Sequence, residues 1–254
     1  MKQKDAFTLL ELSIVLTIIG LIMGGIVIGR SLVRQGELRA AVSEYDTYLK
    51  AIKEFQDKYL ALPGDTSTAA NIWGATVTDN GDGNGTIGTS STAGVIADTA
   101  GTGSIGSTGE WFLAWQHLAL AGFISGSYPG TGTTSLAGTN VPLSKSGGGW
   151  TVFYYLNSTN GTSLWPDQYG HVLAFAASGA NYATPAISGI LTPAEASDID
   201  TKLDDGMPGT GKIRAWRHTV LNNCTDETVP TQIGTIYSTA YAGKTCALVF
   251  LLGF

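Results

Sequence analysis

Residues 7–28 read FTLLELSIVLTIIGLIMGGIVI, and this stretch decides the fold because its 22 residues hold a single charge. A helix rises about 1.5 Å per residue, so one of this length spans the roughly 30 Å hydrocarbon core of a bilayer. Lys2 and Lys4 precede the stretch and Arg30 follows it, so the basic residues alone do not fix its orientation. We expect one membrane-spanning helix, with the leader at residues 1–6 in the cytoplasm and the bulk of the chain outside.

A cleaved secretory signal is the main alternative for this stretch. Three features count against it: the apolar run is longer than the usual ~7 to 15 residues, no A-x-A signal-peptidase cleavage site follows it, and it contains Glu11. A carboxylate at membrane depth costs about 2.5 to 3.5 kcal/mol, so Glu11 indicates a functional site with a cationic partner. A cut between Ala6 and Phe7 would create such a partner, the new α-amino group of a neighbouring copy.

The run AFTLLEL at residues 6–12 resembles the processing site of type IV pilins and type II secretion pseudopilins. The resemblance implies that a prepilin peptidase removes the leader and methylates Phe7, and that Glu11 neutralises the amine of the adjacent subunit during assembly. Ala6 stands where glycine is usual before the cut, which is similar to variants that the family tolerates. A further departure is that residues 7–62 contain no proline, so the first helix should have no proline kink.

An amphipathic stretch, residues 29–62, follows the apolar one. Its apolar side chains recur at steps of three and four residues, the period of one helix face: Leu38, Ala41, Val42, Tyr45, Leu49, Ile52, Phe55 and Tyr59. Pro63 and Gly64 should end the helix. The two stretches together predict one helix of roughly 80 Å, with its first half in lipid or against sibling helices and its second half on a globular head, residues 63–254.

The predicted head contains a long loop and several short strands. Residues 74–109 are interpreted as the loop, since 22 of these 36 residues are Gly, Ser or Thr. Strands are expected where short aromatic or β-branched runs lie between turn residues: 150–156, 171–178, 212–217, 232–238 and 246–252. The fold class is therefore α+β. The order of long helix, glycine-rich connection, antiparallel strands and cysteine pair resembles the pilin architecture. A weaker resemblance to a subgroup of larger pilin-like proteins rests on residues 59–65, 115–119 and 199–206.

Two short helices are expected in the head. The first covers residues 110–121, because Ser107 and Glu110 have the spacing of a capping box. The second opens with proline at its first position and a capping box of Thr192 and Glu195, and it closes at Gly206.

Cys224 and Cys246 are the two cysteines of the chain. They lack the paired C-x-x-C spacing of a zinc site, so they form either one disulfide or two reduced core thiols. An exported head favours the disulfide, which would stabilise it by roughly 3 kcal/mol in the loop-entropy model. In pilins a C-terminal disulfide delimits an exposed loop, so the resemblance implies that residues 225–245 form that loop.

The segment NGDGNGTI, residues 80–87, places oxygen side chains at alternate positions, as does the front half of a calcium loop. The twelfth position is Ser91 instead of a bidentate glutamate, so Asp79, Glu110 or a distant acid would have to complete the shell. A plain Asn/Asp/Gly turn explains the same segment, and both interpretations stay open. The candidate calcium ligands are Asp79, Asn80, Asp82 and Asn84.

The charge balance argues against nucleic acid as the main partner, because 20 acidic residues outnumber 14 basic ones. Lys212, Arg214 and Trp216 alternate on one expected β-strand. Such an arrangement can bind single-stranded nucleic acid or phosphate. A solvated strand face explains them equally well.

No residue stands out as a catalytic nucleophile or base. The glycine pattern at residues 101–106 matches a dinucleotide fingerprint but follows no strand. Asp204 and Asp205 form a second acidic candidate, which we interpret as a helix stop. The three histidines are unrelated in spacing and are interpreted as structural or surface residues: His117, His171 and His218.

The sequence therefore predicts a structural subunit, not an enzyme, without a required cofactor. The expected partners are other copies or related pilins, the prepilin peptidase and an inner-membrane assembly platform. The precursor would cross the inner membrane once with its head in the periplasm, and the assembled form would be a surface filament or a periplasmic pseudopilus. The alternatives are a secretion pseudopilin, a minor tip pilin with an adhesive or ligand-binding head, and a membrane-anchored domain that does not polymerise.

Overall fold

A single helix, α1 (Leu9–Tyr59), forms the N-terminal part of the structure, a computed structural model that describes residues 8–88, 109–132, 134–157, 168–177, 189–216, 223–226 and 236–254. The helix begins at a capping box between Thr8 and Glu11. It ends at Leu60, whose left-handed backbone (φ 53°) turns the chain away while its N–H donates to the carbonyl of Gln56. The 51 residues make a rod of about 75 Å, which confirms the long helix, although the helix ends before Pro63.

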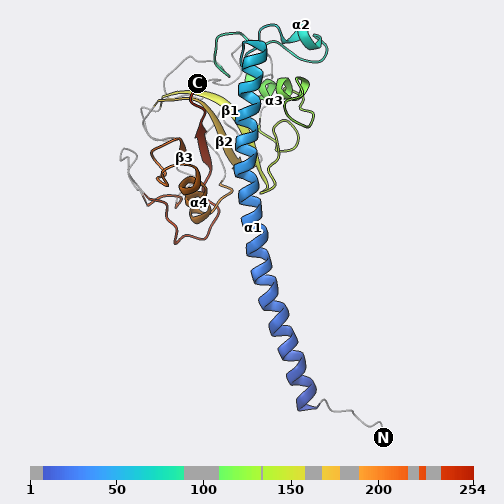
Figure 1. Ribbon diagram of the computed structural model, residues 1–254, viewed down its shortest axis with the longest axis vertical. Coiled ribbons are helices and arrows are strands. Elements are labelled where there is room, and N and C mark those ends of the chain that lie inside the picture. Colours follow the sequence, from blue (N-terminus) through green and yellow to red (C-terminus); the bar gives the residue numbers. More distant parts are fainter. Residues whose placement is uncertain are drawn as a thin grey trace.

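Only the C-terminal half of α1 is docked on the head, and the N-terminal half projects beyond it (Figure 1). Each position of the predicted apolar face, from Leu38 to Tyr59, is buried or half-buried, which confirms that face. Tyr45 stacks on Phe250 of the sheet with ring centroids 4.6 Å apart. The α1 residues that are fully buried are Leu38, Ala41, Ala51, Ile52 and Phe55.

The described strands of the head form one antiparallel sheet in the order β1-β2-β4-β3. The strands are β1 (Gly148–Asn157), β2 (Gln168–Ala177), β3 (Ile213–Ala215) and β4 (Leu248–Leu251). Trp150 pairs with Phe175 across β1 and β2, and their rings stack in the core. Four of the five expected strands are confirmed. The fifth expectation, residues 232–238, is wrong where it can be checked, because Tyr237 makes an isolated bridge to Thr225; residues 232–235 lie outside the described residues.

Three shorter helices complete the described fold: α2 (Ala69–Trp73), α3 (Glu110–Leu120) and α4 (Pro193–Leu203). The capping box of α4 is confirmed, since Thr192 and Glu195 exchange both hydrogen bonds. The capping box expected for α3 is wrong. The N-cap is Gly109, which has no side chain to bond with, and the Glu110 carboxylate accepts from backbone N–H groups of the glycine-rich loop; Ser107 lies outside the described residues. The sequence analysis did not anticipate α2.

Candidate functional site

The part of α1 from Leu9 to Val33, here called the free segment, is exposed, and apart from the charged residues Glu11 and Arg30 it presents apolar side chains on all sides. Its large apolar side chains are between 43% and 88% exposed, so the head does not cover them. α1 is also the one helix, among the residues that the structure describes, that is long and apolar enough to cross a membrane. A helix that is hydrophobic all round requires lipid or other helices around it.

Glu11 lies at the N-terminal end of the free segment. Thr8 donates to Glu11 Oε2 from both its backbone N and its Oγ1, each at 2.9 Å, while Glu11 N donates to Thr8 Oγ1 at 3.2 Å. The capping box therefore holds the carboxylate at the helix N-terminus, where the helix dipole favours negative charge. Ala6 and Phe7, the expected cleavage site, lie outside the described residues.

Arg34 marks the point where the free segment meets the head. Its guanidinium donates to both carboxylate oxygens of Glu195, to Glu37 and to the backbone carbonyls of Ser146 and Ile190. Burial alone would raise the pKa of Glu195, but the hydrogen bonds from Arg34 and from Thr192 N–H hold it below its usual range. Sequence patterns do not reveal this pair, because its members lie 161 positions apart in the chain.

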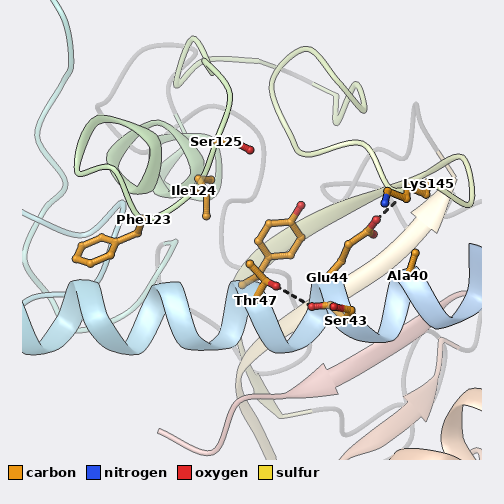
Figure 2. Close-up of a pocket in the computed structure, with 9 residues that line it drawn as sticks. Ala40, Ser43, Glu44, Thr47, Phe123, Ile124, Ser125 and Lys145 are labelled. Carbon is orange, nitrogen blue, oxygen red and sulfur yellow. Dashed lines mark hydrogen bonds between the residues drawn. The ribbon is translucent and has the colours of Figure 1, made fainter.

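A shallow pocket of about 260 Å³ lies between α1, the segment 123–125 that follows α3, and Lys145 just before β1 (Figure 2). Glu44 lies in its wall and accepts from Lys145 N–H at 3.1 Å and from Trp150 Nε1–H at 2.9 Å. Ser43 and Thr47 line the same wall, and the Thr47 hydroxyl donates to the Ser43 carbonyl. Glu44 therefore attaches the start of β1 to α1, whereas the bond between Thr47 and Ser43 stays within the helix.

Three carboxylates meet where the segment after α1, the glycine-rich loop and the start of α3 converge. One carboxylate oxygen from each of Asp65, Asp82 and Glu110 lies within 4.8 Å of the other two. Glu110 accepts from the N–H groups of Asp82 at 2.9 Å and Gly88 at 2.6 Å, and Asp65 Oδ2 accepts from Gly85 N–H at 3.0 Å. Burial raises the pKa of Asp65 to about 6 and that of Glu110 to about 7.

Of the four predicted calcium ligands, the structure places Asp82 in this acidic cluster. Asp79 is exposed and lies outside it. Asn80 Oδ1 accepts from Ala70 N–H, and Asn84 Oδ1 accepts from the N–H and hydroxyl of Thr86. Glu110 is one of the acids expected to complete the shell, and it lies in the cluster. Asp65 was not predicted, because it has no motif spacing to the loop.

A second cluster of carboxylates follows α4 and consists of Asp200, Asp204 and Asp205. Each has protein donors: Asp200 accepts from Gly206 N–H and the Tyr237 hydroxyl, Asp204 from the N–H groups of Lys212 and Ile213, and Asp205 from Met207 N–H and the Thr210 hydroxyl. Burial raises the pKa of Asp200 to about 7. Asp204 is also the C-cap of α4, so the cluster closes the helix and shapes the following turn, as the helix-stop interpretation expected.

Cys224 and Cys246 form a disulfide, with Cα atoms 5.1 Å apart. The bridge lies beside the sheet, because Cys246 comes just before β4 in the chain. The Cys246 carbonyl oxygen accepts from the N–H groups of Ile190 and Leu191. Of the loop that it delimits, residues 227–235 lie outside the described residues.

The remaining sequence candidates have structural roles or lie outside the described residues. His117 Nδ1 accepts from Gly64 N–H at 3.0 Å, and His171 Nε2 accepts from Ile87 N–H at 3.2 Å. Burial lowers the pKa of both, that of His117 to about 4. The expected face around Arg214 is not an open binding surface, since Arg214 and Trp216 are both buried and Arg214 lies over the Tyr169 ring. His218 and the glycine pattern at 101–106 lie outside the described residues.

Comparison with known proteins bears on the N-terminal region. A family model, the prokaryotic N-terminal methylation motif, matches residues 1–27. Searches of curated proteins and of solved structures found no significant match to the chain. The matched region includes the expected cleavage site, Glu11 and most of the free segment, and the described residues that follow α1 form the α+β head. The chain therefore bears the N-terminal signature of type IV pilins and pseudopilins.

Proposed function

We propose that the chain is a prepilin-like structural subunit, cleaved between Ala6 and Phe7 and polymerised through α1 into a type IV pilus or a related filament. The observation that supports this proposal is the free segment, which bears the methylation motif and is apolar on all sides without cover from its own head. Such a surface is stable in lipid or in a bundle of helices. Because each copy presents the same segment, head-to-tail contacts can repeat into an open helical assembly.

Glu11 is the residue that we assign to assembly. It is the one charge in residues 7–28, and an unpaired carboxylate in an apolar environment is unfavourable. The α-amino group that cleavage creates at Phe7 of a neighbouring copy would neutralise it. The pairing would also fix the axial register between neighbouring subunits, since one amine and one carboxylate must coincide.

The proposed route begins with a single-pass precursor in the inner membrane and its head in the periplasm. A prepilin peptidase removes residues 1–6 and methylates Phe7, and an inner-membrane platform then extracts the subunit into the filament. The final location is the cell surface for a pilus and the periplasm for a pseudopilus. The head spans residues 63–254, a size that favours a minor or specialised subunit over a major one, including a tip pilin with a ligand-binding head.

Mass spectrometry of the N-terminus tests the processing step. We expect mature protein that begins at Phe7 and bears a methyl group. A retained Met1, or a cut beyond residue 28, would overturn the proposal and leave a membrane-anchored or secreted α+β domain.

Substitution of Glu11 tests the assembly step. Glu11→Ala should insert and be cleaved but assemble poorly, measured as sheared or cross-linked filament per cell. The matched control is Ser13→Ala in the same turn, since the Ser13 hydroxyl donates to the Leu10 carbonyl of its own helix. Normal filaments from Glu11→Ala would refute the pairing role. Whether the polymer is found outside the cell or in the periplasm separates pilus from pseudopilus.

A further inference from the structure

Among the residues that the structure describes, no cationic side chain pairs with the acidic cluster formed by Asp65, Asp82 and Glu110. Asp65 and Glu110 are each 3% exposed. No ion pair involves any of the three among the described residues, and the sequence has no Lys or Arg from residue 59 through residue 144. Buried carboxylates without a cationic partner are unfavourable in their ionised form. A bound cation would offset this cost and allow the carboxylates to stay ionised.

A second, independent observation is an unpartnered oxygen on a buried side chain. Asp65 Oδ2 accepts from Gly85 N–H, but Oδ1 is buried and has no hydrogen-bond partner within the described part of the chain. The carboxylate that carries this oxygen faces those of Asp82 and Glu110. More than nine-tenths of buried polar groups in proteins have a partner, so an orphan of this kind indicates a missing ligand.

The backbone holds Asp65 in this position. Gly64 has a φ of +89°, and a Cβ there would overlap the carbonyl oxygen of Glu110. The loop wraps around the other side, since Gly83 N–H donates to the Asp65 carbonyl and Gly81 N–H donates to the Thr66 carbonyl. Close backbone packing thus brings the carboxylates together without the help of an ion.

We propose that Asp65, Asp82 and Glu110 bind one calcium ion that joins the end of α1, the glycine-rich loop and the start of α3. Carboxylate oxygens are hard ligands that suit calcium or magnesium. Calcium accepts irregular sets of six to eight oxygens, whereas magnesium demands a near-octahedral shell. Asp82 is exposed, so the ion can enter from solvent on that side and complete its shell with water.

The ion would act on the ends of the glycine-rich segment. Gly88 and Glu110, which flank the stretch from residue 89 to residue 109, are already joined by a hydrogen bond, and Glu110 would be a ligand. Calcium would therefore fix both ends of this stretch to the end of α1. This inference does not depend on filament assembly, because it concerns the head alone.

The second carboxylate cluster provides a matched control. Asp200, Asp204 and Asp205 lie equally close together, but their carboxylates accept from backbone N–H groups and hydroxyls, and none of their oxygens is buried without a partner. Asp205 is exposed, so Asp205→Asn removes a charge from an acidic cluster with little structural change.

Metal binding can be measured on the full chain in detergent micelles. Tb³⁺ luminescence sensitised by tryptophan reports occupancy, since Trp111 follows Glu110 directly, and Ca²⁺ should displace the Tb³⁺ with one site per chain. Thermal unfolding in Ca²⁺, in Mg²⁺ and in chelator gives a second readout, because a ligand that binds the folded state raises its Tm. The variants are Asp65→Asn, Glu110→Gln and the control Asp205→Asn.

We expect Ca²⁺ to raise the Tm of the wild type and of Asp205→Asn. Asp65→Asn and Glu110→Gln should bind Ca²⁺ at least about tenfold more weakly. Without calcium, Asp65→Asn should unfold at the same temperature as the wild type or higher, because it removes like-charge repulsion; this separates a lost ligand from a damaged fold. A wild-type Tm that is equal in Ca²⁺ and chelator, or full binding by Asp65→Asn, would overturn the proposal. An equal response to Mg²⁺ would overturn the choice of calcium.

Discussion

Arg34 on α1 and Glu195 at the start of α4 form a bidentate pair, with Nε 2.6 Å from Oε1 and Nη2 3.0 Å from Oε2. The same Glu195 carboxylate accepts from Thr192 N–H and completes the capping box of α4. One side chain thus determines both where α4 begins and where the head contacts the helix just beyond the free segment. Bidentate geometry adds directional specificity to the attraction between the charges.

Arg34→Ala should lower the free energy of unfolding by about 1.5 to 3 kcal/mol, the range for hydrogen bonds to charged groups. Glu195 would lose both bonds while its side chain stays only 16% exposed. Chemical denaturation of the full chain in detergent measures the change. The control is Lys50→Ala, which removes an ion pair to Glu54 whose side chains are 75% and 48% exposed and should cost less than about 1 kcal/mol. Equal effects of the two substitutions would show that the head does not depend on Arg34.

Tyr237→Phe should destabilise the head by about 1 to 3 kcal/mol, because its hydroxyl donates to the buried Asp200 carboxylate at 2.8 Å. Tyr237 is 4% exposed and joins the loop between Cys224 and Cys246 to α4. Tyr241→Phe is the control, since Tyr241 is 42% exposed. The comparison uses thermal unfolding at pH 8, above the raised pKa of Asp200, where that carboxylate is ionised. A loss of stability as large in Tyr241→Phe would contradict the assigned role.

His117 should make the stability of the head depend on pH. Its ring packs against Phe55 and Trp73, and burial lowers its pKa to about 4, compared with about 6.5 in an unfolded chain. The unfolded state therefore binds more protons between these values, so the contribution of neutral His117 is complete above pH 6.5 and is lost as the pH falls toward 4. Over the full window the loss amounts to about 3 kcal/mol.

The substitution His117→Gln isolates this contribution. The raised pKa of Asp200 acts in the opposite direction, because its stabilising effect is present at low pH and is lost as the pH rises through about 7. The difference between wild type and His117→Gln removes that background. We expect the destabilisation caused by the substitution to be large at pH 7 and to shrink at pH 4.5. A difference that does not change with pH would refute the neutral buried histidine.

Reduction of Cys224–Cys246 should destabilise the head by roughly 3 kcal/mol, the loop-entropy value for a sequence separation of 22. Unfolding with and without reductant measures the change, and the double substitution Cys224→Ser with Cys246→Ser should reproduce the reduced state. Reductant should have no effect on that double variant. If reduction left the wild type unchanged, the bridge would not contribute to stability.

Local patterns predicted the parts of the fold that local interactions determine. The apolar face from Leu38 to Tyr59 and the capping box of Thr192 and Glu195 both depend on residues three or four apart, and both are confirmed. The same rule failed at Glu110, whose carboxylate binds backbone N–H groups of residues 82 and 88 instead of capping its own helix. A tertiary contact replaced the local one there.

Contacts between distant residues could not be predicted from sequence spacing. Asp65 lies 45 positions before Glu110 in the chain, and the close packing of Gly64 against the carbonyl of Glu110 brings the two together. Arg34 and Glu195 have no motif between them either. The contacts that position the head and its acidic cluster therefore depend on the three-dimensional fold and leave no local pattern in the sequence.

The continuity of α1 has a mechanical consequence. Residues 9–59 form one helix without a proline or an intervening loop, and its C-terminal half is embedded in the aromatic core of the head. An axial push or pull on the N-terminal end is therefore transmitted to the head along a hydrogen-bonded rod that no proline interrupts.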